Sequence, residues 1–169
     1  MSHVEAGALG ITRKSYRRRL WAVRHARFFE IVYNLFEPVL ELLAPLWRRI
    51  GPQRIEKPMM RVEKTIKSLL FDCRMCGQCV LSETGMSCPM NCPKSIRNGP
   101  CGGVRANGHC EVVPDMPCVW VQAWQGRQQM KRQQDQDARL KPLDHRKFNH
   151  SSWLEPALQR RQFIGPAGE

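Results

Sequence analysis

The sequence lacks the residue patterns of the common enzyme classes. No catalytic set of serine, histidine and aspartate, no pair of catalytic carboxylates, no flavin motif and no dinucleotide-binding fingerprint stands out in its 169 residues. The glycine-rich stretch at residues 98–103 follows no strand pattern and precedes no Gly-Lys-Ser or Gly-Lys-Thr, so it does not predict a phosphate-binding loop. These absences favour a structural or electron-carrying protein over an enzyme that works alone.

Signals for export and for membrane insertion are missing as well. The basic run at residues 17–19 is followed by only four apolar residues before Arg24, His25 and Arg27 interrupt the stretch, and no small-residue cleavage site follows. The most apolar window, residues 28–46, contains three glutamates. A charge at the centre of a bilayer costs about 2.5–3.5 kcal/mol. We therefore expect a cytoplasmic protein with no membrane span.

Basic residues are in excess, with a formal net charge of +12, but the excess is unevenly distributed. Eleven basic against five acidic residues give +6 over residues 1–60, seven against five give +2 over 61–120, and nine against five give +4 over 121–169. A metal-organised module that grips nucleic acid normally carries positive charge itself, where it neutralises phosphates. Since the charge here lies on the two flanking arms, it fits docking to an acidic protein at least as well as nucleic-acid binding, and we expect no nucleic-acid partner.

Apolar residues recur at helical spacing through the N-terminal third. A first helix is predicted from residue 16 to Pro38, which ends or kinks it, and a second from Pro38 to Gly51. These two faces either pack on the rest of the chain as a helical hairpin or form a docking surface for another subunit. The apolar faces consist of Phe28, Ile31, Val32, Leu35 and Phe36, and of Val39, Leu42, Leu43, Leu46, Trp47 and Ile50.

Two further helices are predicted on either side of the cysteine-rich segment. A short one starts after Cys118 and places Trp120 and Trp124 four residues apart on one face, where core packing is expected. The other covers residues 58–71 and delivers the chain to the first cysteine. Its inward face is predicted to hold Met59, Val62, Ile66, Leu69 and Leu70.

The C-terminal part of the sequence has no continuous apolar face. Residues 125–136 are rich in glutamine and polar nearly all round, which indicates a solvated helix end or a linker. From residue 140 onward, large side chains are scattered between prolines and charges, and they either wrap a partner or cross back over the chain's own module. These side chains are Phe148, Trp153, Leu154, Leu158, Phe163 and Ile164.

All eight cysteines lie between residues 73 and 118, with none in the 72 residues before or the 51 after. The prolines and glycines packed around them leave little room for regular structure, so we expect loops folded around metal. An even number of cysteines also permits four disulfides, but the lack of an export signal favours reduced thiols. The predicted metal and cofactor ligands are Cys73, Cys76, Cys79, Cys88, Cys92, Cys101, Cys110 and Cys118.

The spacing of these cysteines bears on the choice of metal. Structural zinc sites favour two separated C-x2–4-C knuckles, and this chain has one such region. Cys73, Cys76 and Cys79 instead form a C-x2-C-x2-C turn of the ferredoxin type, and Cys92 precedes a proline, as the remote ligand of that motif does. We predict one or two [4Fe–4S] clusters, with Zn²⁺ as the alternative. The pairing stays open; one partition groups Cys92 with the first three cysteines and Cys88 with the last three.

Five short motifs follow one another over residues 71–120. They are Phe71-Asp72-Cys73-x2-Cys76-Gly77-x-Cys79, Cys88-Pro-Met-Asn-Cys92-Pro93-Lys94, Asn98-Gly99-Pro100-Cys101-Gly102-Gly103, Gly108-x-Cys110-Glu111 and Cys118-x-Trp120. In this order they resemble the methylenetetrahydrofolate reductase C-terminal domain family. All eight cysteines fall on the cysteine motifs of that family, whereas the basic N-terminal arm and the Gln/Arg-rich tail match none of its motifs.

The resemblance implies a small subunit or fused domain beside a flavin-containing methylenetetrahydrofolate reductase barrel, in one-carbon (folate) metabolism. Because family members have been described as zinc-binding or as holders of [4Fe–4S] clusters, the chain is expected to relay electrons to that partner or to stabilise it, with flavin only on the partner. The alternative function is a zinc-organised structural adaptor that binds a protein partner or nucleic acid.

The sequence thus predicts a mainly α fold with a loop-rich, metal-organised cysteine module and little or no β-sheet. It divides into a basic N-terminal amphipathic helical arm at 1–57, a cysteine-rich metal-binding module at 58–124, and a polar linker with a partner-docking tail at 125–169. The chain is expected to be a non-catalytic subunit of an oxidoreductase.

Overall fold

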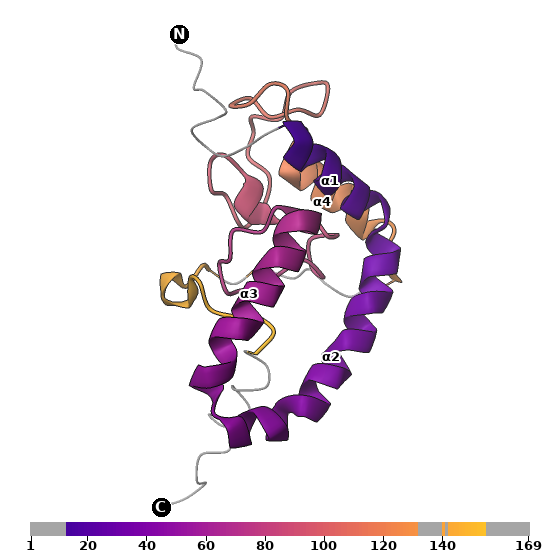
Figure 1. The fold of residues 1–169 in the computed structure, drawn as a ribbon. Helices are drawn as coiled ribbons and strands as arrows, with labels where there is room; N and C mark the ends of the chain where they lie inside the picture. The colour runs from indigo at the N-terminus through magenta and orange to yellow at the C-terminus, as the bar shows by residue number, and fades with distance from the viewer. Residues whose placement is uncertain (1–12, 132–139, 141, 155–169) are drawn as a thin grey trace, which may run out of the picture.

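A computed structural model describes residues 13–131, 140 and 142–154 (Figure 1). Its helices are α1 (Arg13–Arg24), α2 (Ala26–Ile50), α3 (Pro52–Phe71) and α4 (Val119–Arg127), with short 3-10 helices η1 (Pro89–Asn91) and η3 (His145–Lys147). The described residues form no strand, and their β-type pairing is limited to two isolated bridges, Val104 with Cys110 and His109 with Pro117. The predicted fold class, mainly α with a loop-rich cysteine segment, is confirmed.

The break between the first two helices lies at His25, so the prediction that one helix ends and another begins at Pro38 is wrong, whereas a kink at Pro38 stays a prediction. Helix α2 continues through Pro38 and Pro45 for 25 residues. Each proline removes one backbone donor and bends a helix, but the remaining hydrogen bonds of so long a helix maintain it. At the real break, the carbonyl oxygen of Trp21 accepts from the backbone amide of His25 at 3.1 Å and lies 2.8 Å from Nδ1 of the same residue, so His25 closes the end of α1.

Helix α3 begins six residues earlier than the sequence predicts and buries a different face. Proline at the first helical position, Pro52, needs no backbone donor, and Gly51 before it adopts the positive φ of 101° that reverses the chain. The predicted inward residues Val62, Ile66 and Leu69 are exposed, whereas the buried residues include Glu63, Lys67 and Phe71. Phe71 reaches the core, and the two charged residues reach the cysteine segment.

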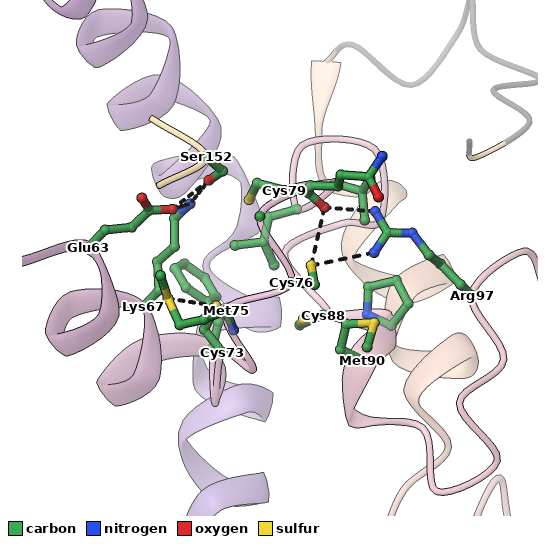
Figure 2. A pocket seen from close by; sticks show the side chains of 16 residues that line it. Glu63, Lys67, Cys73, Met75, Cys76, Cys79, Cys88, Met90, Arg97 and Ser152 are labelled. Carbon is green, nitrogen blue, oxygen red and sulfur yellow. Dashed lines mark hydrogen bonds and ion pairs between the residues drawn. The ribbon is translucent and has the colours of Figure 1, made fainter. Parts of the chain in front are cut away.

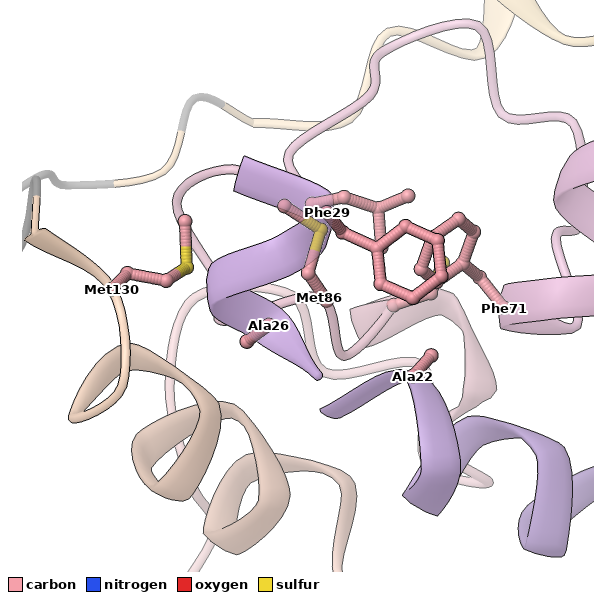
Figure 3. Close-up of a cluster of buried hydrophobic side chains, with 8 residues drawn as sticks. Ala22, Ala26, Phe29, Phe71, Met86 and Met130 are labelled. Carbon is pink, nitrogen blue, oxygen red and sulfur yellow. The ribbon is translucent and has the colours of Figure 1, made fainter. Parts of the chain in front are cut away.

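The main hydrophobic core joins the N-terminal helices to the cysteine-rich loops (Figure 3). The ring of Phe29 on α2 meets that of Phe71 at 5.1 Å between centroids, in an edge-to-face arrangement. Each fully buried side chain of this kind stabilises the fold by about 1.5–3 kcal/mol. The core consists of Ala22, Ala26, Phe29, Phe71, Leu81, Met86, Cys88 and Met130.

Residues 142–154, called here the C-terminal strap, cross back over the chain's own module. The amide of Asn149 donates to the carbonyl oxygen of Met75 at 2.9 Å, and the ring of Trp153 packs edge-on against Phe36 at 4.9 Å. Leu154 is buried beside Trp47 of α2. Of the two roles predicted for the tail, the described residues therefore show the crossing back over the chain's own module. Leu158, Phe163 and Ile164 lie outside the described residues.

Two surface features complete the fold. The outer face of α2 exposes most of the apolar residues predicted to dock a partner, with Leu42 77 % exposed and Leu35 67 % exposed. Trp124 on α4 is 63 % exposed, so its predicted core packing is wrong, whereas the indole of Trp120 donates to the carbonyl oxygen of Ile96 at 3.2 Å.

Among the described helices, none combines the length and the apolar character needed to cross a membrane.

Candidate metal centre

Four of the eight cysteines line one cavity beside the C-terminal end of α3 (Figure 2). They are Cys73, Cys76 and Cys79 from the loop after the helix, and Cys88 from the residue before η1. The volume of the cavity is about 20 Å³. Cys76 and Cys88 are buried, Cys73 is partly buried and Cys79 is exposed; all eight cysteines are free thiols. The partition proposed from the sequence grouped Cys92 with the first three cysteines, whereas the cavity has Cys88 as its fourth cysteine.

The loop at residues 73–79 turns because two of its residues adopt left-handed backbone conformations. Met75 has φ 49° and Gly77 has φ 73°. The amide nitrogen of Met75 lies 3.4 Å from Sγ of Cys73, so the backbone itself donates to a sulfur atom. A Cβ on Gly77 would lie 2.0 Å from the carbonyl oxygen of Lys147 in the C-terminal strap. Glycine at this position thus permits both the turn and the close contact with the strap.

A buried arginine holds one side of the cavity. Nη2 of Arg97 donates to the carbonyl oxygen of Gln78 at 2.7 Å, and Nη1 lies 3.5 Å from Sγ of Cys76. The remaining donor of the guanidinium, Nε, is buried without an acceptor in this structure. A fixed positive charge and an unused donor beside a sulfur atom favour a negatively charged occupant of the cavity.

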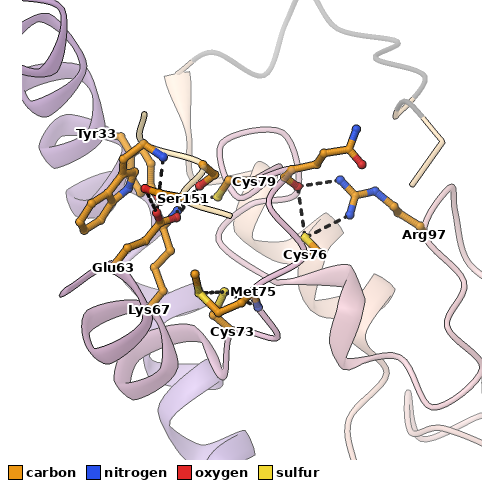
Figure 4. Close-up of polar contacts among 12 residues, drawn as sticks. Tyr33, Glu63, Lys67, Cys73, Met75, Cys76, Cys79, Arg97 and Ser151 are labelled. Atoms are coloured by element: carbon orange, nitrogen blue, oxygen red, sulfur yellow. Dashed lines mark hydrogen bonds and ion pairs between the residues drawn. The ribbon is translucent and has the colours of Figure 1, made fainter. Parts of the chain in front are cut away.

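A buried lysine holds the opposite side (Figure 4). Nζ of Lys67 lies 2.7 Å from Oε1 of Glu63 and 2.8 Å from Oγ of Ser152, and both charged side chains are 2 % exposed. Oγ of Ser151 donates to the other carboxylate oxygen of Glu63 at 2.6 Å. Burial alone would lower the pKa of Lys67, but its acidic neighbours Cys79, Tyr33 and Glu63 raise it above its ordinary value. Lys67 is therefore a permanent cation next to the cysteines.

Tyr33 on α2 reaches the exposed end of the cysteine loop. Its hydroxyl oxygen lies 3.7 Å from Sγ of Cys79, a distance within hydrogen-bond range for sulfur. The pKa of Tyr33 is raised, first by burial and then by Cys79. The hydroxyl therefore keeps its proton and donates to Cys79 whenever that sulfur is a thiolate.

Two thiols of the cavity, those of Cys73 and Cys88, have raised pKa values and resist ionisation. Burial raises the pKa of Cys73 to about 11, and burial followed by the neighbouring Cys73 raises the pKa of Cys88 well above its usual range. A metal ion binds thiolate and not thiol, so it must displace these protons. The cavity therefore favours thiolates only when a cation accompanies them.

The other predicted ligands lie outside this cavity. Cys110 and Cys118 are buried in turns of the chain. The amide of Cys110 donates to the carbonyl oxygen of Met116 at 2.9 Å, and the amide of Cys118 donates to the carbonyl oxygen of Gly108 at 3.0 Å. Cys92 and Cys101 are partly buried. Among the described residues, no three Cys, His, Asp or Glu side chains lie close enough together to hold a single metal ion. The ligand roles of all eight cysteines stay predictions.

Sequence reasoning missed the polar residues around the cavity. Arg97 lies 18 residues beyond Cys79 with no motif to mark it. Glu63 and Lys67 do have a signal, because opposite charges four residues apart pair on a helix, but nothing in the sequence placed that pair inside. Tyr33 and the serines of the strap come from the two arms that were predicted to serve a partner.

Comparisons with known proteins bear on the whole module. Residues 53–146 match a protein-family model described as methylene-tetrahydrofolate reductase C terminal. The match covers more than half of the 169 residues, including all eight cysteines, nearly all of α3 and the whole of α4, whereas α1 and α2 lie outside it. No curated protein and no solved structure matches the chain at a significant level.

Proposed function

Since the chain belongs to the family described as methylene-tetrahydrofolate reductase C terminal, we propose that it is an accessory subunit of a methylenetetrahydrofolate reductase in one-carbon metabolism. In this proposal the chain holds at least one [4Fe–4S] cluster and exchanges electrons with a catalytic partner that carries the flavin. The observation that carries the proposal is the cavity in which four cysteines face one space between two buried cations.

The residues around the cavity suit an iron–sulfur cluster. Each iron of a cubane takes one thiolate, and the available thiols are those of Cys73, Cys76, Cys79 and Cys88. When bound, such a cluster supplies one-electron redox chemistry.

The chain's own residues would set the electrostatics of that chemistry. Lys67 and Arg97 place two positive charges beside four thiolates, and the Met75 amide and Tyr33 hydroxyl add hydrogen bonds to sulfur. Positive charge and hydrogen bonds both stabilise the more negative, reduced state of a cluster and raise its potential. The strap covers Lys67 and so limits the access of water to the pair it forms with Glu63.

The outer face of α2 supports the role of subunit. Phe28, Leu35, Leu42 and Leu46 form part of an apolar stripe that the chain leaves exposed, and large exposed apolar patches mark interfaces. Helix α2 lies outside the family match, so this surface belongs to the chain's own extension. We assign this surface of α2 as the binding site of the catalytic partner.

Anaerobic purification tests the metal. We expect a brown protein with iron and inorganic sulfide in equal amounts, whose broad visible absorbance bleaches with dithionite. Replacing Cys76 by Ser should lower the iron content and destabilise the module, whereas replacing Arg74, whose side chain is more exposed, should not. A colourless protein with stoichiometric zinc would contradict the cluster and support a zinc-organised adaptor.

Co-purification with a methylenetetrahydrofolate reductase tests the partner. The variant Leu42→Glu places a charge in the middle of the α2 stripe and should abolish co-purification while the metal content stays the same. The matched control is Trp124→Glu, a similarly exposed apolar residue on α4, which should leave the complex intact. Equal retention of the reductase by both variants would remove α2 from the interface.

A further inference from the structure

A second hollow adjoins the cysteine cavity on the side of Cys79. The two share Lys67, Cys79 and Ser152, but the second is larger, with a volume of about 260 Å³ against about 20 Å³. Its walls come from α2, from the turn at residues 82–83 and from the C-terminal strap. We call it the Cys79 hollow.

Cys79 is the point at which the cysteine cavity meets this hollow. It is the exposed member of the four cysteines, and its Sγ lies 3.7 Å from the hydroxyl of Tyr33, which also lines the hollow (Figure 4). Cys76 and Cys88 are buried. A molecule bound in the hollow therefore reaches the cysteine centre at Cys79, whereas Cys76 and Cys88 are shielded from solvent.

The lining of the hollow selects a kind of ligand. Tyr33, Phe36 and Trp153 provide aromatic surfaces, and Glu37 and Glu83 provide two carboxylates. The positive charge among its lining residues is that of Lys67, which already pairs with Glu63 at 2.7 Å. Aromatic walls with two carboxylates attract a planar group that carries positive charge or N–H donors, and they repel anions.

We propose that the Cys79 hollow is the electron-exchange site of this chain and that it admits a planar aromatic redox group with an electropositive edge. The inference rests on the proposed function for its redox step. In that step one electron passes from the bound aromatic group to the centre held by the cysteines. No bond forms or breaks, and the aromatic group loses the one electron that the centre gains.

Methyl viologen is a suitable probe, because it is a planar aromatic dication whose reduced form donates one electron. Two variants change the hollow: Glu37→Lys with Glu83→Lys reverses its charge, and Ser82→Trp fills it. The matched controls are Asp115→Lys on an exposed loop and Gln125→Trp on the exposed side of α4. All are made in the full chain, and iron content is measured for each.

Binding of oxidised methyl viologen by calorimetry is the first readout. We expect the unchanged chain and both controls to bind methyl viologen. Both hollow variants should bind it at least about tenfold more weakly, which is the smallest effect expected of a reversed local charge. Absence of binding to the unchanged chain, or equal binding by the hollow variants, overturns the proposal. This arm gives its answer whether or not the chain holds a cluster.

The rate of cluster bleaching is the second readout. Reduced methyl viologen should bleach both hollow variants about tenfold more slowly than the unchanged chain. Dithionite, a small anion, should bleach the filled variant at the rate of the unchanged chain and should not be slowed by the reversed charge of the other variant. Equal viologen rates in a chain that holds its iron overturn the proposal. A chain without iron contradicts the proposed function instead, and the binding measurement then decides whether the hollow is a ligand site.

Discussion

The first four cysteines and the last four sit in different kinds of structure. Cys73, Cys76, Cys79 and Cys88 face one cavity whose other walls come from distant parts of the chain, among them Lys67 and Ser152. The last four are spread over turns that close on themselves through backbone hydrogen bonds, such as the one from Glu111 to Gly103 at 3.1 Å. The spacing differs as well, since two residues separate each of the first three cysteines, whereas seven or eight separate each of the last four. The difference teaches that close spacing brings three thiols together and that tertiary packing adds Cys88 and the charged walls.

The sharpest test of this comparison separates Cys88 from Cys92. The cavity contains Cys88, whereas the ferredoxin-like spacing predicts Cys92 as the fourth ligand. We expect Cys88→Ala to remove the iron of the first centre and Cys92→Ala to leave it, as measured by iron analysis and by the electron paramagnetic resonance of the reduced protein. Loss of a structural metal costs about 10–16 kcal/mol in small zinc domains, so this is the largest effect predicted. The opposite pattern would restore the partition drawn from the sequence.

The ion pairs of the two halves allow a matched comparison of stability. Lys67 with Glu63 is buried, whereas Lys94 with Glu111 in the second half is partly exposed. Removing one partner of a buried pair leaves an uncompensated charge and costs about 3–5 kcal/mol, while an exposed pair contributes about 0–1 kcal/mol. We expect Lys67→Met to lower the free energy of unfolding by the first amount and Lys94→Met by the second. Urea denaturation measures both, and equal losses would mean that the strap does not bury Glu63.

Two glycines provide a smaller contrast. An alanine at Gly77 would place its Cβ 2.0 Å from the carbonyl oxygen of Lys147 and would strain a residue with φ 73°, whereas a Cβ at Gly102 meets nothing within 4 Å. We expect Gly77→Ala to destabilise the protein by about 1–3 kcal/mol and to loosen the strap, with Gly102→Ala close to neutral. Thermal unfolding gives the stability, and amide exchange at Asn149, which donates to Met75, reports the strap.

The smallest effect concerns acid. Hydrogen bonds from the side chain and backbone of Arg146 lower the pKa of Asp144 in the strap from 3.8 to about 2. The unfolded chain therefore binds a proton at higher pH than the folded one, so the contribution of Asp144 is fully present above pH 3.8 and is lost as pH falls towards about 2. We expect Asp144→Asn to flatten the dependence of stability on pH in that window. An unchanged slope would show that the interaction does not survive in solution.

The sequence predicted the helical class, the third helix and the cysteine cluster, because each depends on local pattern. It failed where tertiary contacts override pattern. Apolar periodicity assigned Val62, Ile66 and Leu69 to the interior, but the charged pair Glu63 and Lys67 occupies that place. Periodicity carries no information about an ion pair that a remote segment buries. The sequence likewise predicted a helix boundary at Pro38, but a long helix tolerates the loss of one hydrogen bond.

The contact between Glu63 and Ser151 spans 88 residues of chain, and this separation orders the events of folding. Helices form within microseconds, whereas contacts between remote residues wait for the closure of long loops. On a ribosome, α3 and all the cysteines are synthesised before the strap. Ser152, which lines the cavity, arrives after the four thiols that face the same space. The strap therefore can close over the cavity only after all four of its thiols have been synthesised.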